Sequence, residues 1–285
     1  MSLNAGKDNK PFFSIVIPTY NSAGTIAACV ESIVQQSFQD IEVLIMDGLS
    51  TDSTIEILED FKRQLPSLKI KQEKDKGIYD AMNKGLDCAQ GEYLYFIGSD
   101  DTLYDKDVLG NIFKLLSPSQ PKILYGNVRM QGSNQWVEDG LIHAGEFDLK
   151  RLLSHNISHQ AIFYHRSVFD KLGRYNTTYP IFADYDMNLR CFANYSFVYT
   201  DTIIANFKVG GASTGLADTA FDKDKLKNII NYFHTQLFSR AFVDCRLFVQ
   251  RAAFSAGTGI SLLTRLYCML AYAKLKTQAL LAWSR

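Results

Sequence analysis

Residues 95–101 read Tyr95-Phe96-Ile97-Gly98-Ser99-Asp100-Asp101. Aromatic and aliphatic residues of this kind are typical of a buried strand. Two adjacent carboxylates are costly to bury unless a cation or hydrogen bonds compensate their charge. The pattern therefore predicts a strand whose carboxyl end presents Asp100 and Asp101 to a divalent metal ion. The alternative is an ordinary strand that ends in a surface turn or a helix cap.

Strand and helix signals alternate on both sides of this stretch, over the first 130 residues. Short apolar runs predict strands at 12–17, 41–46, 68–72, from 91 onward and at 123–125. Apolar residues at helical spacing predict helices at 26–34, 55–61, 78–89 and 108–116. We expect an α/β fold with a doubly wound, mostly parallel sheet and helices on both faces.

Polar residues stand where each predicted strand ends. Thr19-Tyr20-Asn21 follow the first strand, Asp47-Gly48 the second, Asp75 to Gly77 the third and Asp100-Asp101 the fourth. Ligands of doubly wound folds bind beyond the carboxyl ends of the strands. These segments are therefore expected to form one polar rim, which is a stronger indication of a binding site than any single motif.

Composition limits the classes of protein that fit. The chain has 285 residues and a formal net charge of zero, so its overall charge gives no indication of a nucleic-acid partner. Its five cysteines are scattered, which favours reduced thiols and a cytoplasmic location over a disulfide framework or a zinc site. Residues 1–10 are polar and are expected to be disordered or tag-like, and no run is apolar enough to span a bilayer.

The segment 218–285 is expected to form a helical C-terminal extension. Apolar residues from Leu262 to Trp283 cover most faces of the last helix, so it must be covered by something. It could pack on the rest of the chain or on a second subunit, as in a homodimer, or it could dock on an anionic membrane surface. The last 41 residues favour the membrane through six basic residues and no Asp or Glu: Arg246, Arg251, Arg265, Lys274, Lys276 and Arg285.

Four segments resemble, in order and spacing, the motifs of the family 2 glycosyltransferases: Ser14-Ile15-Val16-Ile17-Pro18-Thr19-Tyr20-Asn21, Asp47-Gly48-Leu49-Ser50-Thr51-Asp52-Ser53-Thr54, Glu73-Lys74-Asp75-Lys76-Gly77-Ile78-Tyr79-Asp80-Ala81-Met82-Asn83-Lys84-Gly85 and Gly98-Ser99-Asp100-Asp101. The resemblance covers about residues 12–215. It implies a GT-A catalytic domain at 11–217, with a nucleotide-binding half at about 11–130 and an acceptor half at about 131–217.

The implied activity is transfer of a sugar, with inversion, from a nucleotide diphosphate sugar to a hydroxyl of a glycan or a lipid-linked saccharide. The expected donor is a UDP-sugar. An enzyme of this kind would work in the cytoplasm, with the inner face of the membrane as a peripheral location. The resemblance assigns donor binding to residues at the strand ends and on the third predicted helix: Pro18, Thr19, Tyr20, Asn21, Asp47, Gly48, Asp75, Gly77, Asp80, Asn83 and Asp100. Asp47 would accept the imide N–H of uracil, or it could merely close a turn with Gly48 and Ser50.

Asp101 is the expected metal ligand, because hard oxygen ligands with open positions suit Mn²⁺ or Mg²⁺. Asp100 would reach the ribose or a metal-bound water. Gly98 stands where many family members have Asp or Asn, so metal binding would depend heavily on the nucleotide itself.

The segment 179–190 resembles the family's Glu-Asp-x-Asp/Glu segment and matches Asp184 to the catalytic base, with Asp186 as the alternative. Ala183 replaces the usual Glu. Without the resemblance, acids at a helix N-terminus that favour its dipole would explain the segment. His159-Gln160 resemble a family feature on the acceptor side, together with Asp186.

Two other classes of function remain in view. The chain could be a catalytically idle module that binds a nucleotide sugar, given Gly98 and Ala183. It could also be a nucleotidyltransferase, although Pro18 to Thr25 lacks the basic residues of that class.

Overall fold

The computed structural model describes residues 10–135, 137–211, 217–255 and 257–283. The chain divides into two compact units. Unit 1 consists of Met1–Gly145, Ser158–Pro180 and Tyr195–Leu216, and unit 2 of Glu146–Ile157, Ile181–Asn194 and Ala217–Arg285. The expected catalytic domain at 11–217 thus draws on both units. Of the N-terminal stretch 1–10, residues 1–9 lie outside the described residues.

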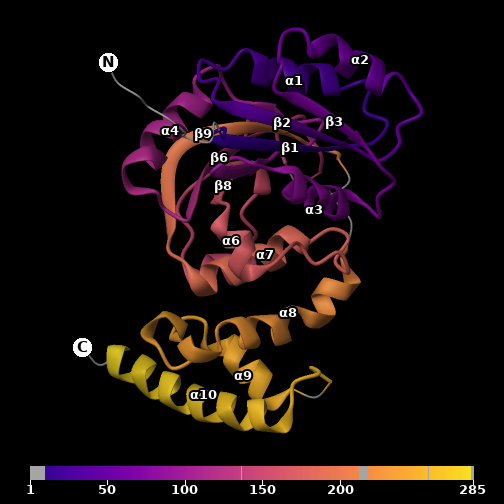
Figure 1. Cartoon of the computed structure of the whole chain (residues 1–285). Coiled ribbons are helices and arrows are strands. Elements are labelled where there is room, and N and C mark those ends of the chain that lie inside the picture. Colours follow the sequence, from indigo (N-terminus) through magenta and orange to yellow (C-terminus); the bar gives the residue numbers. More distant parts are fainter. Residues whose placement is uncertain (1–9, 136, 212–216, 256, 284–285) are drawn as a thin grey trace, which may run out of the picture. The chain divides into compact units, whose positions relative to one another are not determined.

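Unit 1 is built on a sheet in which four strands are parallel neighbours (Figure 1). Their order is β3 (Leu68–Gln72), β2 (Ile41–Asp47), β1 (Phe13–Thr19) and β4 (Tyr93–Phe96). The sheet continues with β8 (Ile162–His165), antiparallel to both β4 and β6 (Ile123–Gln131), and then with β9 (Phe197–Lys208), parallel to β6. The short strands β5 (Thr102–Leu103) and β7 (Ile142–His143) pair with β9 and β6.

Helices cover both faces of this sheet, which confirms the predicted layering. Figure 1 shows α1 (Ile26–Val34) and α2 (Thr54–Phe61) on one side of β1 and β2, and α3 (Ile78–Cys88) on the other. Ile15 and Ile17 pack into a core with Cys29 of α1, whereas Val16 lies against Gly85 of α3. Unit 1 also holds α4 (Val108–Ser119), the 3-10 helix η1 (His159–Ala161) and α6 (Ser167–Leu172).

The strand β1 continues past Pro18, where the sequence predicts its end. Pro18 lies opposite Met46 of β2, and the strand ends at Thr19. The Val16 carbonyl faces β4 and the Thr19 carbonyl faces β2, so the alternation of backbone groups directs Pro18 toward β4. Pairing with β4 ends after Val16, and the missing N–H of Pro18 therefore breaks no ladder hydrogen bond.

Unit 2 is helical in its described part. It contains α5 (Leu149–Ser154), α7 (Ala183–Asn194), α8 (Thr219–Tyr232), η2 (His234–Gln236), η3 (Arg240–Phe242), α9 (Arg246–Phe254) and α10 (Leu262–Trp283). α7 packs against α5 and α8, and α9 packs against α10. No helix in the described ranges combines the length and the apolar character needed to cross a bilayer.

A buried carboxylate fastens the amino-terminal edge of the sheet in unit 1. Glu42 accepts hydrogen bonds from Ser14 Oγ at 2.7 Å, the Gln90 N–H at 2.5 Å and Lys69 Nζ at 2.9 Å. Burial by itself would raise the pKa of Glu42, but the hydrogen bonds from Ser14, Lys69 and Gln90 outweigh it and hold this pKa below the ordinary value. The carboxylate thereby joins β1, β2, β3 and the turn before β4.

We expect Glu42→Ala to lower the free energy of unfolding by about 3 kcal/mol, because buried donors of Ser14 and Gln90 lose their acceptor. The full difference in the free energy of unfolding should be present at neutral pH. The folded-state pKa of Glu42 is depressed, so its contribution is present above the unfolded value of 4.5 and is lost as the pH falls through the folded value. Urea denaturation at several pH values measures the difference.

Asp60→Ala is the matched control. Asp60 pairs with Arg63 on the surface, with side chains 74% and 83% exposed, and such pairs contribute little. Equal losses for the two variants would contradict the structural role of Glu42.

Candidate active site

The polar residues at the carboxyl ends of β1, β2 and β4 are brought together in unit 1. The Gly48 N–H donates to the Thr19 carbonyl at 2.8 Å, which joins the ends of β1 and β2. Ser22 Oγ and Ser99 Oγ lie 2.8 Å apart and join the loops that follow β1 and β4. The sequence did not single out this serine contact, which holds the first and fourth motifs side by side.

The loop after β1 is fixed by Asn21. This residue has a φ of +48°, a conformation that Asn tolerates better than most residues. Its side-chain oxygen accepts from the Thr51 N–H, and its own N–H donates to Ser50 Oγ, both at 2.8 Å. Thr19 is buried, whereas Tyr20 is 62% exposed. Asn21 therefore shapes the loop, and the ring of Tyr20 is the group available to a ligand.

Asp47, at the end of β2, closes a turn with Gly48 and Ser50, which is the alternative to a uracil contact that the sequence analysis gave. Its carboxylate accepts from Ser50 Oγ at 2.5 Å, from the Ser50 N–H at 3.0 Å and from Gln72 Nε2 at 3.5 Å. The side chain is 1% exposed. These contacts hold the Gly48–Ser50 turn in place.

Asp75, after β3, places a half-buried carboxylate over Gly48. A Cβ atom at position 48 would lie 2.5 Å from Asp75 Oδ2 and 3.5 Å from the ring of Tyr20. Glycine at position 48 therefore leaves the space that the Asp75 carboxylate occupies, and a side chain there would displace it. Asp75, Gly48 and Tyr20 form one patch at the rim.

The residues at the start of α3 have different roles. Gly77 has a φ of +117° that strongly favours glycine, and its N–H donates to Asp75 Oδ1 at 2.9 Å. Asp80 accepts from the Lys76 N–H at 3.0 Å and lies 3.5 Å from Lys84 Nζ. Asp80 therefore orders the turn that carries Asp75.

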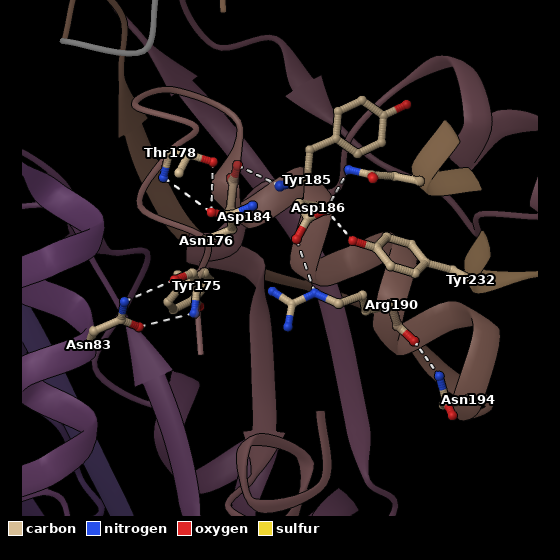
Figure 2. A network of polar contacts seen from close by, with 11 residues as sticks. Asn83, Tyr175, Asn176, Thr178, Asp184, Tyr185, Asp186, Arg190, Asn194 and Tyr232 are labelled. Atoms are coloured by element: carbon tan, nitrogen blue, oxygen red, sulfur yellow. Dashed lines mark hydrogen bonds and ion pairs between the residues drawn. The ribbon is translucent and has the colours of Figure 1, made fainter. Parts of the chain in front are cut away.

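Asn83 spans two segments of unit 1. Its side chain donates to the Tyr175 carbonyl at 2.9 Å and accepts from the Tyr175 N–H at 3.0 Å (Figure 2). It is 8% exposed. This pair of hydrogen bonds joins α3 to the loop after α6.

Gly98 lets the two adjacent carboxylates fold back over the turn after β4. A Cβ atom at position 98 would lie 2.7 Å from Asp101 Oδ2 and 2.8 Å from Asp100 Oδ1. The Gly98 carbonyl accepts from Cys29 Sγ at 3.4 Å. A side chain at position 98 would therefore require the carboxylates of Asp100 and Asp101 to shift from these positions.

Asp101 is tethered from two distant segments. Its Oδ2 accepts from Gln160 Nε2 at 2.7 Å, and its Oδ1 accepts from the Lys208 N–H at the end of β9 at 2.8 Å. Burial, and then the charge of Asp100, raise the pKa of Asp101 to about 6, although these hydrogen bonds and nearby His159 act in the opposite direction. Asp101 is 2% exposed. Gln160 thus positions Asp101, a role that its sequence context did not reveal.

Asp100 is half-buried and lies beside the loop after β9. A Cβ atom at Gly211 would lie 2.9 Å from Asp100 Oδ2, so this glycine also makes room for a carboxylate.

The acid pair suits a divalent cation chemically. Two adjacent carboxylates repel each other, and a bound cation would relieve this repulsion, which adds to the effect of burial on the pKa of Asp101. Over the described ranges, no group of three or more His, Cys, Asp or Glu side chains gathers into a metal site. A cation held here would need further ligands from a diphosphate and from water.

In unit 2, Asp184 and Asp186 lie in the first turn of α7, and both are buried. Asp184 accepts from the N–H of Tyr185 at 2.7 Å. The start of the helix is held by Asp218, which accepts from the N–H groups of Ile181 and Phe182, both at 3.0 Å. Asp218 also caps α8 through the Phe221 N–H. The sequence does not single out Asp218, because no local pattern indicates its contacts with residues 181 and 182.

Asp186 holds α7 against α8 (Figure 2). Its carboxylate accepts from Tyr232 Oη at 2.7 Å, Arg190 Nε at 3.0 Å and Asn228 Nδ2 at 3.2 Å. Burial raises the pKa of Asp186, although Arg190 and the hydrogen bonds act in the opposite direction. This set of donors indicates a structural role within unit 2.

Comparison with known proteins identifies relatives. The model of the family described as glycosyl transferase family 2 matches residues 14–173. A PGL/p-HBAD biosynthesis glycosyltransferase of Mycobacterium bovis (strain BCG / Pasteur 1173P2) is 42% identical over 225 residues, which cover 77% of this chain and 84% of that protein.

Two solved structures share the fold. S. aureus TarS 1-349 in complex with UDP-GlcNAc matches with a TM-score of 0.62 and 18% identity, over 92% of this chain and 80% of that one. The mannosyltransferase PcManGT from Pyrobaculum calidifontis, in complex with GDP-Man and Mn²⁺, matches with a TM-score of 0.54 and 16% identity, over 98% of this chain and 90% of that one. These likenesses confirm the GT-A fold. The family match over more than half of the chain, together with the 42% identical relative, leads to one conclusion: this protein belongs to glycosyl transferase family 2 and is a glycosyltransferase.

Proposed function

We propose that this enzyme transfers a sugar from a UDP-sugar to a hydroxyl of a glycan or a lipid-linked saccharide, with inversion at the anomeric carbon. The observation that carries the donor site is the joined rim of unit 1, where the ends of β1, β2 and β4 meet and Asp75 lies over Gly48. The UDP-GlcNAc complex of TarS and the GDP-Man complex of PcManGT support a nucleotide-sugar donor.

Uracil recognition is assigned to the patch of Tyr20, Gly48 and Asp75. The exposed ring of Tyr20 offers a stacking surface, and the half-buried carboxylate of Asp75 can accept the imide N–H of the base. Asp47 has its carboxylate committed to Ser50 and Gln72. Its part is to hold the turn at Gly48 in the conformation that Asp75 needs.

The diphosphate is assigned to the turn of Asp100 and Asp101. A Mn²⁺ or Mg²⁺ ion held there would neutralise charge on the leaving diphosphate. Gln160 and Lys208 fix the Asp101 carboxylate in one orientation, while half-buried Asp100 remains closer to solvent and suits a contact with the ribose or a metal-bound water.

Asp184 is proposed as the base. The acceptor hydroxyl oxygen forms a bond to the anomeric carbon as the bond from that carbon to the diphosphate oxygen breaks, and the hydroxyl proton passes to the Asp184 carboxylate. A single displacement of this kind inverts the anomeric configuration. Asp186 is the weaker candidate because Tyr232, Arg190 and Asn228 engage its oxygens.

A cytoplasmic location is part of the proposal. The five cysteines of the chain are free thiols, which fits a reducing compartment.

An idle nucleotide-sugar-binding module is the second candidate, favoured by Gly98 and Ala183.

We expect the wild type to gain thermal stability with a UDP-sugar and Mn²⁺ in a panel that also contains GDP- and dTDP-sugars, because ligand binding to the folded state raises apparent stability. Asp184→Asn should keep this shift and lose sugar transfer to a hydroxyl acceptor. Wild-type protein that binds the donor without transfer or hydrolysis would favour the idle module, and a retained anomer in the product would exclude the single displacement.

The variant Asp75→Ala tests the proposed contact between Asp75 and the uracil ring of the donor. We expect the Kd for UDP, measured by calorimetry, to rise about tenfold because a charged hydrogen-bond acceptor is lost. Asp170→Ala, at an exposed position on α6, serves as the control and should leave the Kd unchanged. If Asp75→Ala leaves the Kd for UDP unchanged and Asp47→Asn raises it, the contact with the uracil ring belongs to Asp47.

Gly98→Ala tests the turn that carries the acid pair. The added Cβ would meet Asp100 and Asp101 at 2.8 and 2.7 Å, and displacing catalytic groups by about 1 Å can reduce the rate about a hundredfold. Gly24→Ala is the matched control, because nothing lies within 4 Å of a Cβ there. Equal transfer rates in the two variants would show that the positions of these acids do not matter.

A further inference from the structure

The C-terminal helix α10 has two apolar faces, and only one of them is covered. Cys268, Ala271, Leu275 and Ala279 are buried, and their spacing of three or four residues places them on one side of the helix. This side packs mainly against α9, as the element contacts and Figure 1 agree. The covered face accounts for only part of the apolar residues of α10.

The opposite face carries six exposed leucines. Their side chains are 48% to 80% exposed: Leu262, Leu263, Leu266, Leu270, Leu280 and Leu281. At about 100° of rotation per residue, these positions fall within one stripe about 100° wide, opposite the buried residues. We call this stripe the leucine face. Single exposed leucines are common, but six of them on one face of a helix, four near its start and two near its end, indicate an interaction surface.

The charges beside the leucine face are of one sign. Lys274 and Lys276 are exposed and border it on its two sides. From residue 245 to the end the chain contains no Asp or Glu, although its overall net charge is zero. The basic bias is therefore local to this part of the chain.

This charge pattern distinguishes between two occupants of the leucine face. A second copy of the chain that docked helix to helix would bring lysines near lysines, with no acidic side chain on α10 to compensate them. An anionic lipid surface provides both an apolar layer for the leucines and negative headgroups for the lysines. A helix of 22 residues that fails the requirements for crossing a bilayer can still lie in its surface.

We propose that the leucine face of α10 docks on an anionic membrane surface, with the helix in the plane of the interface, the leucines in the acyl boundary and Lys274 and Lys276 at the headgroups. The inference depends on α10 alone and goes beyond the sugar-transfer activity. For an acceptor carried on a lipid, this contact would hold the enzyme at the surface where the acceptor lies.

The test is sedimentation of the full-length protein with vesicles of phosphatidylcholine alone or with added phosphatidylglycerol. We expect binding to the anionic vesicles and at least about tenfold weaker partitioning of the double variant Leu266→Ser/Leu270→Ser. Leu115→Ser is the matched control, an exposed leucine on helix α4, and should bind like the wild type.

A second variant keeps the leucines in place. Lys274→Glu/Lys276→Glu should reduce binding to anionic vesicles about tenfold or more and have little effect on the neutral ones. Circular dichroism confirms that each variant is folded.

Three results would overturn the proposal: no binding of the wild type to anionic vesicles, binding that neither double variant weakens, or a dimer in analytical ultracentrifugation that Leu266→Ser/Leu270→Ser dissociates while vesicles remain unbound. The last result would assign the leucine face to a second copy of the chain.

Discussion

The parallel pairing of β1 with β2 on one side and β4 on the other is the constraint on which the proposed donor site of unit 1 depends. Thr19 lies opposite Asp47, and Val16 lies opposite Phe96. Parallel strands end on the same edge of a sheet, so this register delivers the loops after β1, β2 and β4 to one place. The hydrogen bonds between these loops then fix their conformation, and the buried Glu42 fastens the opposite end of the same strands.

The acids of the chain differ in what their oxygens do. Buried carboxylates need donors, and those with a full set become part of the framework. Asp47 and Asp186 belong to this group, the first within a turn of unit 1 and the second between helices of unit 2. Asp75 and Asp100 are only half-buried, and glycines at 48, 98 and 211 leave them the space they occupy. Accessible acids next to glycines are the ones suited to a ligand, because both the charge and the approach are available.

Asp101 stands between these groups. It is hydrogen-bonded, yet its pKa is raised, first by burial and then by the charge of Asp100 beside it. A carboxylate held in a fixed orientation, beside a second acid whose charge a cation would neutralise, suits the metal-bound diphosphate that we propose for this turn. In the proposed function, binding of a cation and the donor diphosphate would relieve the repulsion between Asp100 and Asp101 at the turn after β4.

The amino-acid sequence by itself determined the alternation of strands and helices, the acids at the strand ends, the resemblance to family 2 glycosyltransferases and the apolar character of α10. These features follow from local periodicity and short motifs, which neighbouring residues set. Only the tertiary structure decided which atoms each acid engages. Gln160 reaches Asp101 across 59 positions, and Asn83 reaches Tyr175 across 92. Such partners lie far apart in the sequence and meet only when the chain folds, so no local pattern encodes them. The same holds for α10, whose covered side was settled by packing against α9, because a helix that is apolar all round gives no indication of which side faces the protein.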